Sequence, residues 1–326
     1  MQIHVSFDYE LFFGSASGTA EKCILEPTQQ LMAIADKHKV PFIFFIDAGY
    51  VLRLKSYLHE PACKADYERI AAQLKQLTTQ GHEIALHIHP HWEDSVFENG
   101  QWRIDTTRYK LADFKEDEVR SIITNYHRAM TEITGRPCRS YRAGGWCVQP
   151  FAPIKKALAE NGIYMDSTVY HKGYHASVAH AYDFRTAPDL AEWNFEDDPC
   201  VVQQTGRFKE IPVTPDTIPP LFYWQLYLNM RSNPSVYKPV GDGNWLVDRK
   251  RIYKHFYSST DHFACCDGFF ASRLKPILKR AEKQGKSRLM ILSHPKSMAS
   301  YSFKALDEFI IFAKAKGHRF HTITGE

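Results

Sequence analysis

The chain has 326 residues, 44% of them hydrophobic and 24% charged, which is ordinary for a folded globular protein and excludes an intrinsically disordered one. Its net charge of +4 is small for this length, so the composition gives no support for a nucleic-acid partner. The seven cysteines include no CxxC pair, which favours reduced thiols and argues against a structural zinc cluster built from cysteines.

The first predicted element is a strand with Ile3, Val5 and Phe7 on one face, ending at the acidic pair Asp8 and Glu10. This start lacks the basic and then apolar pattern of a signal peptide, and no later stretch is apolar enough for a transmembrane helix. We therefore expect a cytoplasmic protein without a membrane span. A helix follows from Pro27, and residues 41–46 are predicted to form a buried strand.

The alternation of helix and strand then continues. Residues 65–80 are predicted to be helical, and residues 82–86 form a strand that leads into the histidine-rich run HEIALHIHPHW. Apolar residues at three- and four-residue intervals predict an amphipathic helix over 115–134. A short strand ending at Arg142, a helix over 150–160 and a strand over 163–166 complete this half of the chain.

The alternation of helix and strand is absent from residues 171–265, which contain prolines, aromatic residues and short strand-like segments. We interpret them as an insertion, suited either to sugar stacking or to a small packed subdomain, within one catalytic domain over 1–326. Regular order returns afterwards with predicted helices over 271–284 and 303–316 and strands over 289–293 and 320–323. The pattern indicates an α/β protein with a parallel sheet, open or closed into a barrel.

Ligands of such folds bind at the carboxyl ends of the strands. The polar side chains expected at those ends are Asp8, Glu10, His87 to His91, Arg142, Asp166 and His294. Each has an ordinary structural interpretation by itself, but their shared position indicates a site. Two imidazoles and a carboxylate are typical ligands of a catalytic divalent metal, a further carboxylate can act as a base, and His294 can protonate a leaving group.

Five segments of the sequence resemble the motifs of the polysaccharide deacetylases of carbohydrate esterase family 4, which share the NodB-like homology domain. They occur in the family's order, outside the predicted insertion. In chain order these segments are Ser6-Phe7-Asp8-Tyr9-Glu10, Gly81-His82-Glu83-Ile84 leading to His87 and His91, Thr134-Gly135-Arg136-Pro137 leading to Arg142-Ala143-Gly144-Gly145-Trp146, Tyr164-Met165-Asp166-Ser167-Thr168, and Ile291-Leu292-Ser293-His294-Pro295.

The resemblance implies a deformed (β/α)7 barrel that uses one divalent metal ion, most often Zn²⁺ but also Co²⁺, Ni²⁺ or Fe²⁺, to remove acetyl from an N-acetylated or O-acetylated sugar. It implies that Asp8 is the base, that Arg142 holds this base and that His294 is the acid, with Asp166 as its neighbour. His87 and His91 would bind the metal. The backbone N–H near Gly145 would hold the oxyanion. From their positions beside these groups, and not from the family pattern, we expect Trp92 and Trp146 to contact the sugar.

Three departures from the family pattern leave choices open. Tyr9 stands where the family has a metal-binding Asp, so we assign that role to Glu10, which shares a strand face with Asp8. Which of these two carboxylates is base and which is ligand stays open. Pro90 disfavours helical geometry at His89, so His89 is an alternative to His91 as the second imidazole. A Gly-Gly-Trp run also replaces the family's proline-containing segment.

Two competing interpretations remain. One is a catalytically inactive glycan-binding homologue, which the tyrosine at position 9 makes credible; the other is a metallo-hydrolase of the amidohydrolase or PHP phosphoesterase type, whose His-x-His signature resembles His87 and His89. If the protein is cytoplasmic, a nucleotide-linked or lipid-linked sugar of surface polysaccharide synthesis is the expected substrate. The sequence does not determine the oligomeric state.

Overall fold

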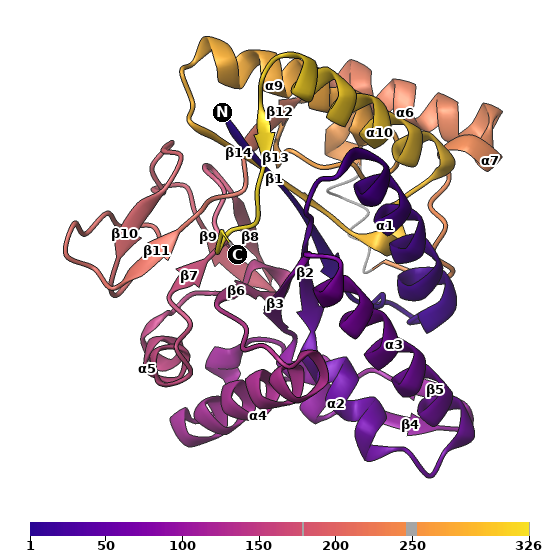
Figure 1. Ribbon diagram of the computed structural model, residues 1–326, viewed down its shortest axis with the longest axis vertical. Coiled ribbons are helices and arrows are strands. Elements are labelled where there is room, and N and C mark those ends of the chain that lie inside the picture. Colours follow the sequence, from indigo (N-terminus) through magenta and orange to yellow (C-terminus); the bar gives the residue numbers. More distant parts are fainter. Residues whose placement is uncertain (178, 246–252, 326) are drawn as a thin grey trace. The chain divides into compact units, whose positions relative to one another are not determined.

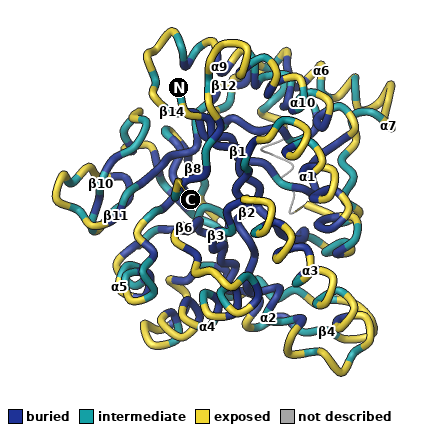
Figure 2. Tube along the Cα trace, in the orientation of Figure 1, coloured by how far each residue is buried: buried dark blue, intermediate teal, exposed yellow. Residues whose placement is uncertain are grey.

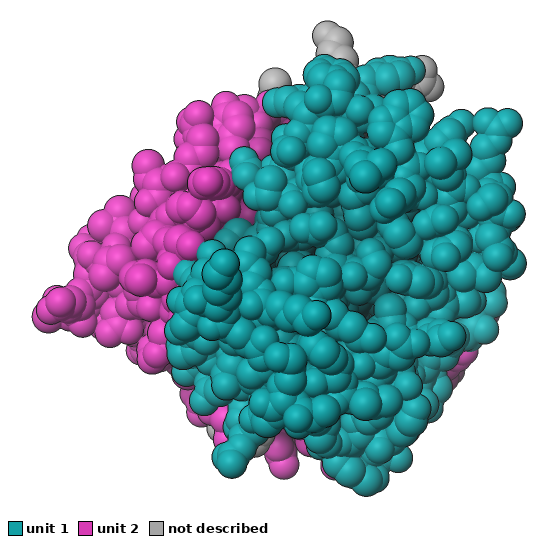
Figure 3. All heavy atoms as spheres, turned by 90° about the horizontal axis from the view of Figure 1, so that it is seen from above, with its two compact units in different colours: residues 1–42, 213–321 teal, residues 43–212, 322–326 magenta. Residues whose placement is uncertain are grey.

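The computed structural model describes residues 1–177, 179–245 and 253–325. The chain forms two compact units, residues 1–42 with 213–321 and residues 43–212 with 322–326, which we call unit 1 and unit 2 (Figure 3). The central parallel strands of both units are buried, whereas many exposed residues lie in loops, on outer helix faces and in the short hairpins (Figure 2). Among the described residues, no helix is both long and apolar enough to cross a bilayer.

Unit 1 is built on the strand β1 (Gln2–Tyr9), which pairs in parallel with β14 (Arg288–Ser293) and, over its first residues, with β15 (Arg319–Phe320). Every residue of β1 from Ile3 onward is buried, as expected for a parallel strand covered on both faces. The remaining elements of unit 1 are the π-helix η1 (Glu21–Leu25), α1 (Glu26–His38), the hairpin of β12 (Pro215–Ile218) and β13 (Thr260–Phe263), α6 (Pro220–Ser232), α7 (Pro234–Tyr237), the 3₁₀ helices η5 (Gly268–Arg273) and η6 (Pro295–Ser297), α9 (Leu274–Lys283) and α10 (Ser300–Ala315) (Figure 1).

Unit 2 contains a sheet in the order β10-β11-β7-β6-β3-β2, in which only the β10–β11 pair is antiparallel. These strands are β2 (Ile43–Asp47), β3 (Glu83–Ile88), β6 (Ser140–Ala143), β7 (Met165–Asp166), β10 (Trp193–Phe195) and β11 (Phe208–Glu210). The rest of unit 2 comprises the helices α2 (Ala48–Ser56), α3 (Pro61–Thr79), α4 (Glu116–Thr134) and α5 (Ala152–Glu160), the 3₁₀ helices η2 (Pro90–Glu93), η3 (Leu111–Asp113) and η4 (Gly144–Trp146), and the two hairpins β4 (Val96–Glu98) with β5 (Gln101–Arg103) and β8 (Tyr174–Ala176) with β9 (Ala181–Asp183).

The α/β class predicted from the sequence is confirmed, and the long amphipathic helix shows why the pattern was readable. Helix α4 buries the predicted apolar face, including Val119, Ile123 and Met130. It ends at Gly135, whose φ of 72° lies in the left-handed region that glycine adopts without strain. Apolar periodicity and a glycine stop are local signals, so this helix needed no tertiary information.

The predicted insertion is divided between the units, with residues 171–212 in unit 2 and residues 213–265 in unit 1. Residues 178 and 246–252 of this range lie outside the described residues. One catalytic domain with an insertion stays a prediction. The cysteines are all free and buried, in agreement with the expected reduced thiols.

Candidate functional site

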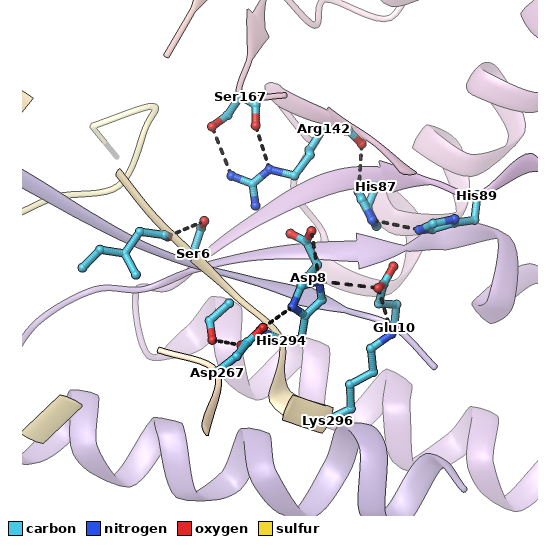
Figure 4. Close-up of polar contacts among 12 residues, drawn as sticks. Ser6, Asp8, Glu10, His87, His89, Arg142, Ser167, Asp267, His294 and Lys296 are labelled. Carbon is cyan, nitrogen blue, oxygen red and sulfur yellow. Dashed lines mark hydrogen bonds and ion pairs between the residues drawn. The ribbon is translucent and has the colours of Figure 1, made fainter. Parts of the chain in front are cut away.

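The acidic part of the predicted site lies at the carboxyl end of β1. Asp8 and Glu10 are two residues apart in extended chain, and both are buried to about 5% exposure. The parallel register sets Phe7 opposite Ser293, so β1 and β14 bring these acids and His294 to one edge of unit 1. His294 Nε2 lies 3.9 Å from Asp8 Oδ2 and 3.7 Å from Glu10 Oε1 (Figure 4).

On its other side, His294 contacts a third carboxylate. Its Nδ1 lies 3.0 Å from Asp267 Oδ2, and its backbone N–H donates to Asp267 Oδ1, which also accepts the Ser293 hydroxyl (Figure 4). Because a carboxylate only accepts, Nδ1 carries a proton and Nε2 faces Asp8 and Glu10. Burial opposes the charged imidazolium, but Asp267, with smaller contributions from Asp8 and Glu10, raises the pKa of His294 above its ordinary value.

Asp267 is a residue that sequence reasoning missed, because it falls just after the irregular region. The resemblance implied Asp166 as the neighbour of His294, and that assignment stays a prediction. Within unit 1, the carboxylate that contacts His294 Nδ1 is that of Asp267. The buried segment Ala264-Cys265-Cys266 hydrogen-bonds through Ala264 to β14 and to Thr214, so it behaves as a further strand that ends in an acid. An apolar run followed by Asp-Gly was the signal that could have revealed it.

Lys296 is a second residue that sequence reasoning missed. Its ammonium group is buried, lies 2.8 Å from Glu10 Oε1, and donates to the carbonyl oxygen of Leu11 (Figure 4). The rings of Phe12, Phe13 and Trp245 surround it at 4.8 to 5.0 Å. Lys296 therefore holds one oxygen of Glu10 by a buried, charge-assisted hydrogen bond.

The imidazole part of the site belongs to unit 2 and follows β3. His87 Nδ1 lies 2.9 Å from the carbonyl oxygen of Arg142, which can only accept, so Nδ1 carries the proton and Nε2 keeps its lone pair. That Nε2 lies 3.1 Å from His89 Nε2, and both rings are buried (Figure 4). Two imidazoles that bind one Zn²⁺ at about 2.0 to 2.1 Å in tetrahedral geometry place their nitrogens roughly this far apart.

His91 and Trp92 lie in the short helix η2 and pack into an aromatic cluster. The His91 ring stacks on Tyr109 at 7° between planes, and its centre lies 5.4 Å from that of His89, compared with 4.8 Å between the centres of His87 and His89. Trp92 is 1% exposed, and its indole N–H donates to Asp47 at 2.6 Å. Trp92 is therefore a core residue of unit 2, and its expected contact with a sugar stays a prediction.

The remaining predicted residues of unit 2 lie at the ends of β6 and β7. Arg142 is buried, donates from Nε to the carbonyl oxygen of Ser167 at 2.7 Å, and has its guanidinium 3.8 Å from the centre of the Phe45 ring. Asp166 accepts the backbone N–H of Thr168 and stands opposite Glu210 in the β7–β11 register. Burial raises the pKa of Asp166, and burial together with the Asp166 charge raises that of Glu210 well above its ordinary value. This buried pair therefore holds a proton.

Gly145 and Trp146 form a strained turn after β6. Gly145 has a φ of 57°, and a Cβ at this position would meet the Tyr109 hydroxyl at 2.6 Å, so only glycine fits. Its carbonyl oxygen lies 2.5 Å from His180 Nε2. Trp146 also has a positive φ, of 65°, and remains partly exposed beside the Tyr170 ring. Backbone strain of this kind is found at functional sites, where surrounding contacts hold it in place.

No protein-family model matches this sequence, and no curated protein matches it significantly. Solved structures do share its fold. A presumed polysaccharide deacetylase from Mycobacterium smegmatis has a TM-score of 0.53 at 20% identity, covering 96% of this chain and 84% of its own. Puue allantoinase has a TM-score of 0.51 at 13% identity, covering 99% of this chain and 87% of its own. The predicted deformed-barrel class is thereby confirmed: over nearly its whole length, the chain has the α/β fold of the polysaccharide deacetylases.

Proposed function

We propose that this protein is a metal-dependent hydrolase that removes acetyl from an N-acetylated, or less often O-acetylated, sugar. The observation that carries the proposal is the arrangement around His294 in unit 1. One ring nitrogen is held by Asp267, and the other faces two buried carboxylates, Asp8 and Glu10. An acid and a base beside each other are what amide or ester hydrolysis requires.

The metal ligands in this proposal are Glu10 and two of the three histidines that follow β3. Glu10, His87 and His89 each offer a buried ligand atom of a type that Zn²⁺, Co²⁺, Ni²⁺ or Fe²⁺ accepts. His87 also has the carbonyl hydrogen bond that orients a metal-binding imidazole. Its Nε2 lies 3.1 Å from that of His89, the alternative to the favoured His91. A divalent ion bound there would polarise the acetyl carbonyl and make water acidic enough to deprotonate near neutral pH.

The remaining groups of the site transfer a proton, stabilise a charge or contact the sugar. Asp8 takes the proton from the attacking water, and the guanidinium of Arg142 orients Asp8. The backbone N–H near Gly145 donates to the developing oxyanion, and Trp146 offers a partly exposed ring to the sugar. His294 then protonates the departing amine, which would otherwise leave as a highly basic anion. A raised pKa suits this last role, because the imidazole must be charged when the bond breaks.

We also propose that the protein acts in the cytoplasm on a nucleotide-linked or lipid-linked sugar. Seven free, buried cysteines support a reducing compartment. Fractionation of the native cells tests the location: recovery of the protein outside the inner membrane would contradict it.

The test of activity measures acetate release by the purified protein, after loading with Zn²⁺ or Co²⁺, from UDP-N-acetylglucosamine, chito-oligosaccharides and acetylated xylan. Allantoin and a phosphate ester serve as competing substrates, since Puue allantoinase shares the fold. We expect acetate release that stops in Asp8→Asn. Hydrolysis of the phosphate ester alone, or glycan binding by a metal-free protein without turnover, would reject the proposal in favour of one of the competing interpretations.

A further inference from the structure

Helix α6 of unit 1 is apolar on two opposite faces. Its inner face, through Phe222, Tyr223 and Leu226, packs on Ile218, Phe269 and Phe270. Its outer face carries Leu221, Trp224 and Leu228, spaced by three and four residues along one stripe, and Leu221 and Leu228 are 66% and 58% exposed. The solvent-facing side of an amphipathic surface helix is normally polar. An apolar stripe on that side therefore indicates a binding surface. Figure 1 shows α6 and α7 at the upper right.

The apolar surface extends beyond α6 onto residues 253–258. Trp224 ties the two segments together, since its indole N–H donates to the carbonyl oxygen of Phe256 and its ring contacts the Phe256 ring at 4.8 Å. Tyr253 and Tyr257 are 70% and 74% exposed in this segment. Together with Tyr227, these residues form an exposed apolar surface, which we call the α6 surface; it comprises Leu221, Trp224, Tyr227, Leu228, Tyr253 and Tyr257. Contiguous patches of this kind usually mark an interaction site.

The charged residues within the two segments that form the α6 surface are of one sign. Residues 220–232 and 253–258 contain no Asp or Glu, whereas Arg231 and Lys254 are exposed within them. A two-fold contact between copies would set these cations against each other without an acid to pair with them. Exposed Leu, Trp and Tyr side chains with neighbouring cations instead match the boundary between the acyl chains and the headgroups of an anionic bilayer.

We propose that the α6 surface docks the protein onto an anionic lipid bilayer as a peripheral contact. The apolar stripe inserts among the upper acyl chains, and Arg231 and Lys254 lie at the level of the phosphate groups. This inference is independent of the proposed function, because it concerns attachment and not the reaction.

Sedimentation with vesicles tests the inference on the full-length protein. We expect it to sediment with vesicles containing 30% phosphatidylglycerol, to sediment much less with pure phosphatidylcholine, and to be partly released by 0.5 M NaCl, because the cations contribute through screened attraction. The double substitution Leu221→Ser with Leu228→Ser should weaken the partition coefficient at least about tenfold, since it removes two apolar groups from the contact.

Ile311→Ser is the matched control, because Ile311 is an apolar residue of unit 1 that is also about half exposed but lies on α10. It should bind vesicles like the unchanged protein. All three proteins are compared by circular dichroism, so that unfolding is not mistaken for lost binding. Absence of vesicle binding would overturn the inference. So would a dimer in light scattering that the double substitution converts to a monomer, because a second copy would then be the occupant.

Discussion

His294 in unit 1 and His82 in unit 2 are both buried imidazoles, yet their environments act on the proton in opposite directions. Asp267, Asp8 and Glu10 raise the pKa of His294 despite its burial. His82 stands at the start of β3 beside the Phe44 ring, and burial lowers its pKa to about 4. One position can therefore supply a proton near neutral pH, and the other stays neutral. The carboxylates, not the histidine itself, decide between a chemical and a structural role.

The same contrast separates the two predicted parts of the site. In unit 1 every functional group is charged or pairs with a charge, as in the contact of Lys296 with Glu10. In unit 2 the imidazoles of His87 and His89 face each other, and a backbone carbonyl orients that of His87, an arrangement typical of neutral ligands. The charged groups around His294 are thus suited to proton transfer, and His87 offers a neutral nitrogen ligand.

The largest effect is expected from removing the imidazole of unit 1. His294→Ala should lower kcat for acetate release about 10³-fold, because a positioned acid contributes about 10²- to 10⁴-fold. His318→Ala is the matched control, since His318 also lies 2.8 Å from a carboxylate, that of Glu282, but on the surface of unit 1. Equal activity of the two variants would remove His294 from the reaction.

The next effect concerns metal binding in unit 2. His87→Ala should weaken Zn²⁺ binding by at least about 100-fold in isothermal titration calorimetry, since even partners that only orient a ligand contribute about 10- to 100-fold. His89→Ala and His91→Ala identify the second imidazole: the geometry favours a large loss in the former. Unchanged affinity in all three variants would exclude the histidine run as the metal site.

His82 gives a prediction on stability. Above pH 6.5 it is neutral in both the folded and unfolded chain. As the pH falls, the unfolded chain binds a proton first, because the folded pKa is about 4, so stability decreases between these two values. The loss from this residue should reach about 3 kcal/mol. The free energy of unfolding, measured with urea at pH 7 and at pH 4.5, should differ less between the two pH values in His82→Leu than in the unchanged protein. His59→Leu changes an exposed histidine and should show the same pH difference in the free energy of unfolding as the unchanged protein.

The smallest effect is expected from the residue that holds His294. Asp267→Asn should reduce kcat/KM about 10- to 100-fold, as for other partners that orient a functional imidazole. Removing the carboxylate charge should also lower the pKa of His294, so the alkaline limb of the pH–rate profile should move to lower pH. A profile that keeps its limb while activity falls would assign Asp267 a purely structural role.

Several features of the molecule followed from short stretches of sequence alone. The apolar intervals of α4, the burial of β1 and β2, and the placement of Asp8, Glu10 and His87 at strand ends each depend on a few neighbouring residues. Strand and helix periodicities are properties of the local backbone, so the α/β class and most of the polar groups of the site were readable without a structure.

Other features required the tertiary structure. Asp267 reaches His294 only because its segment runs beside β14, and Lys296 reaches Glu10 because β1 and β14 are neighbours although nearly 290 residues separate the two side chains in the chain. Burial of Trp92 and exposure of Leu221 likewise depend on what other segments cover. The sequence by itself determined which chemical groups stand at the strand ends; strand pairing and packing decided which of them meet, because those contacts join residues that no local pattern connects.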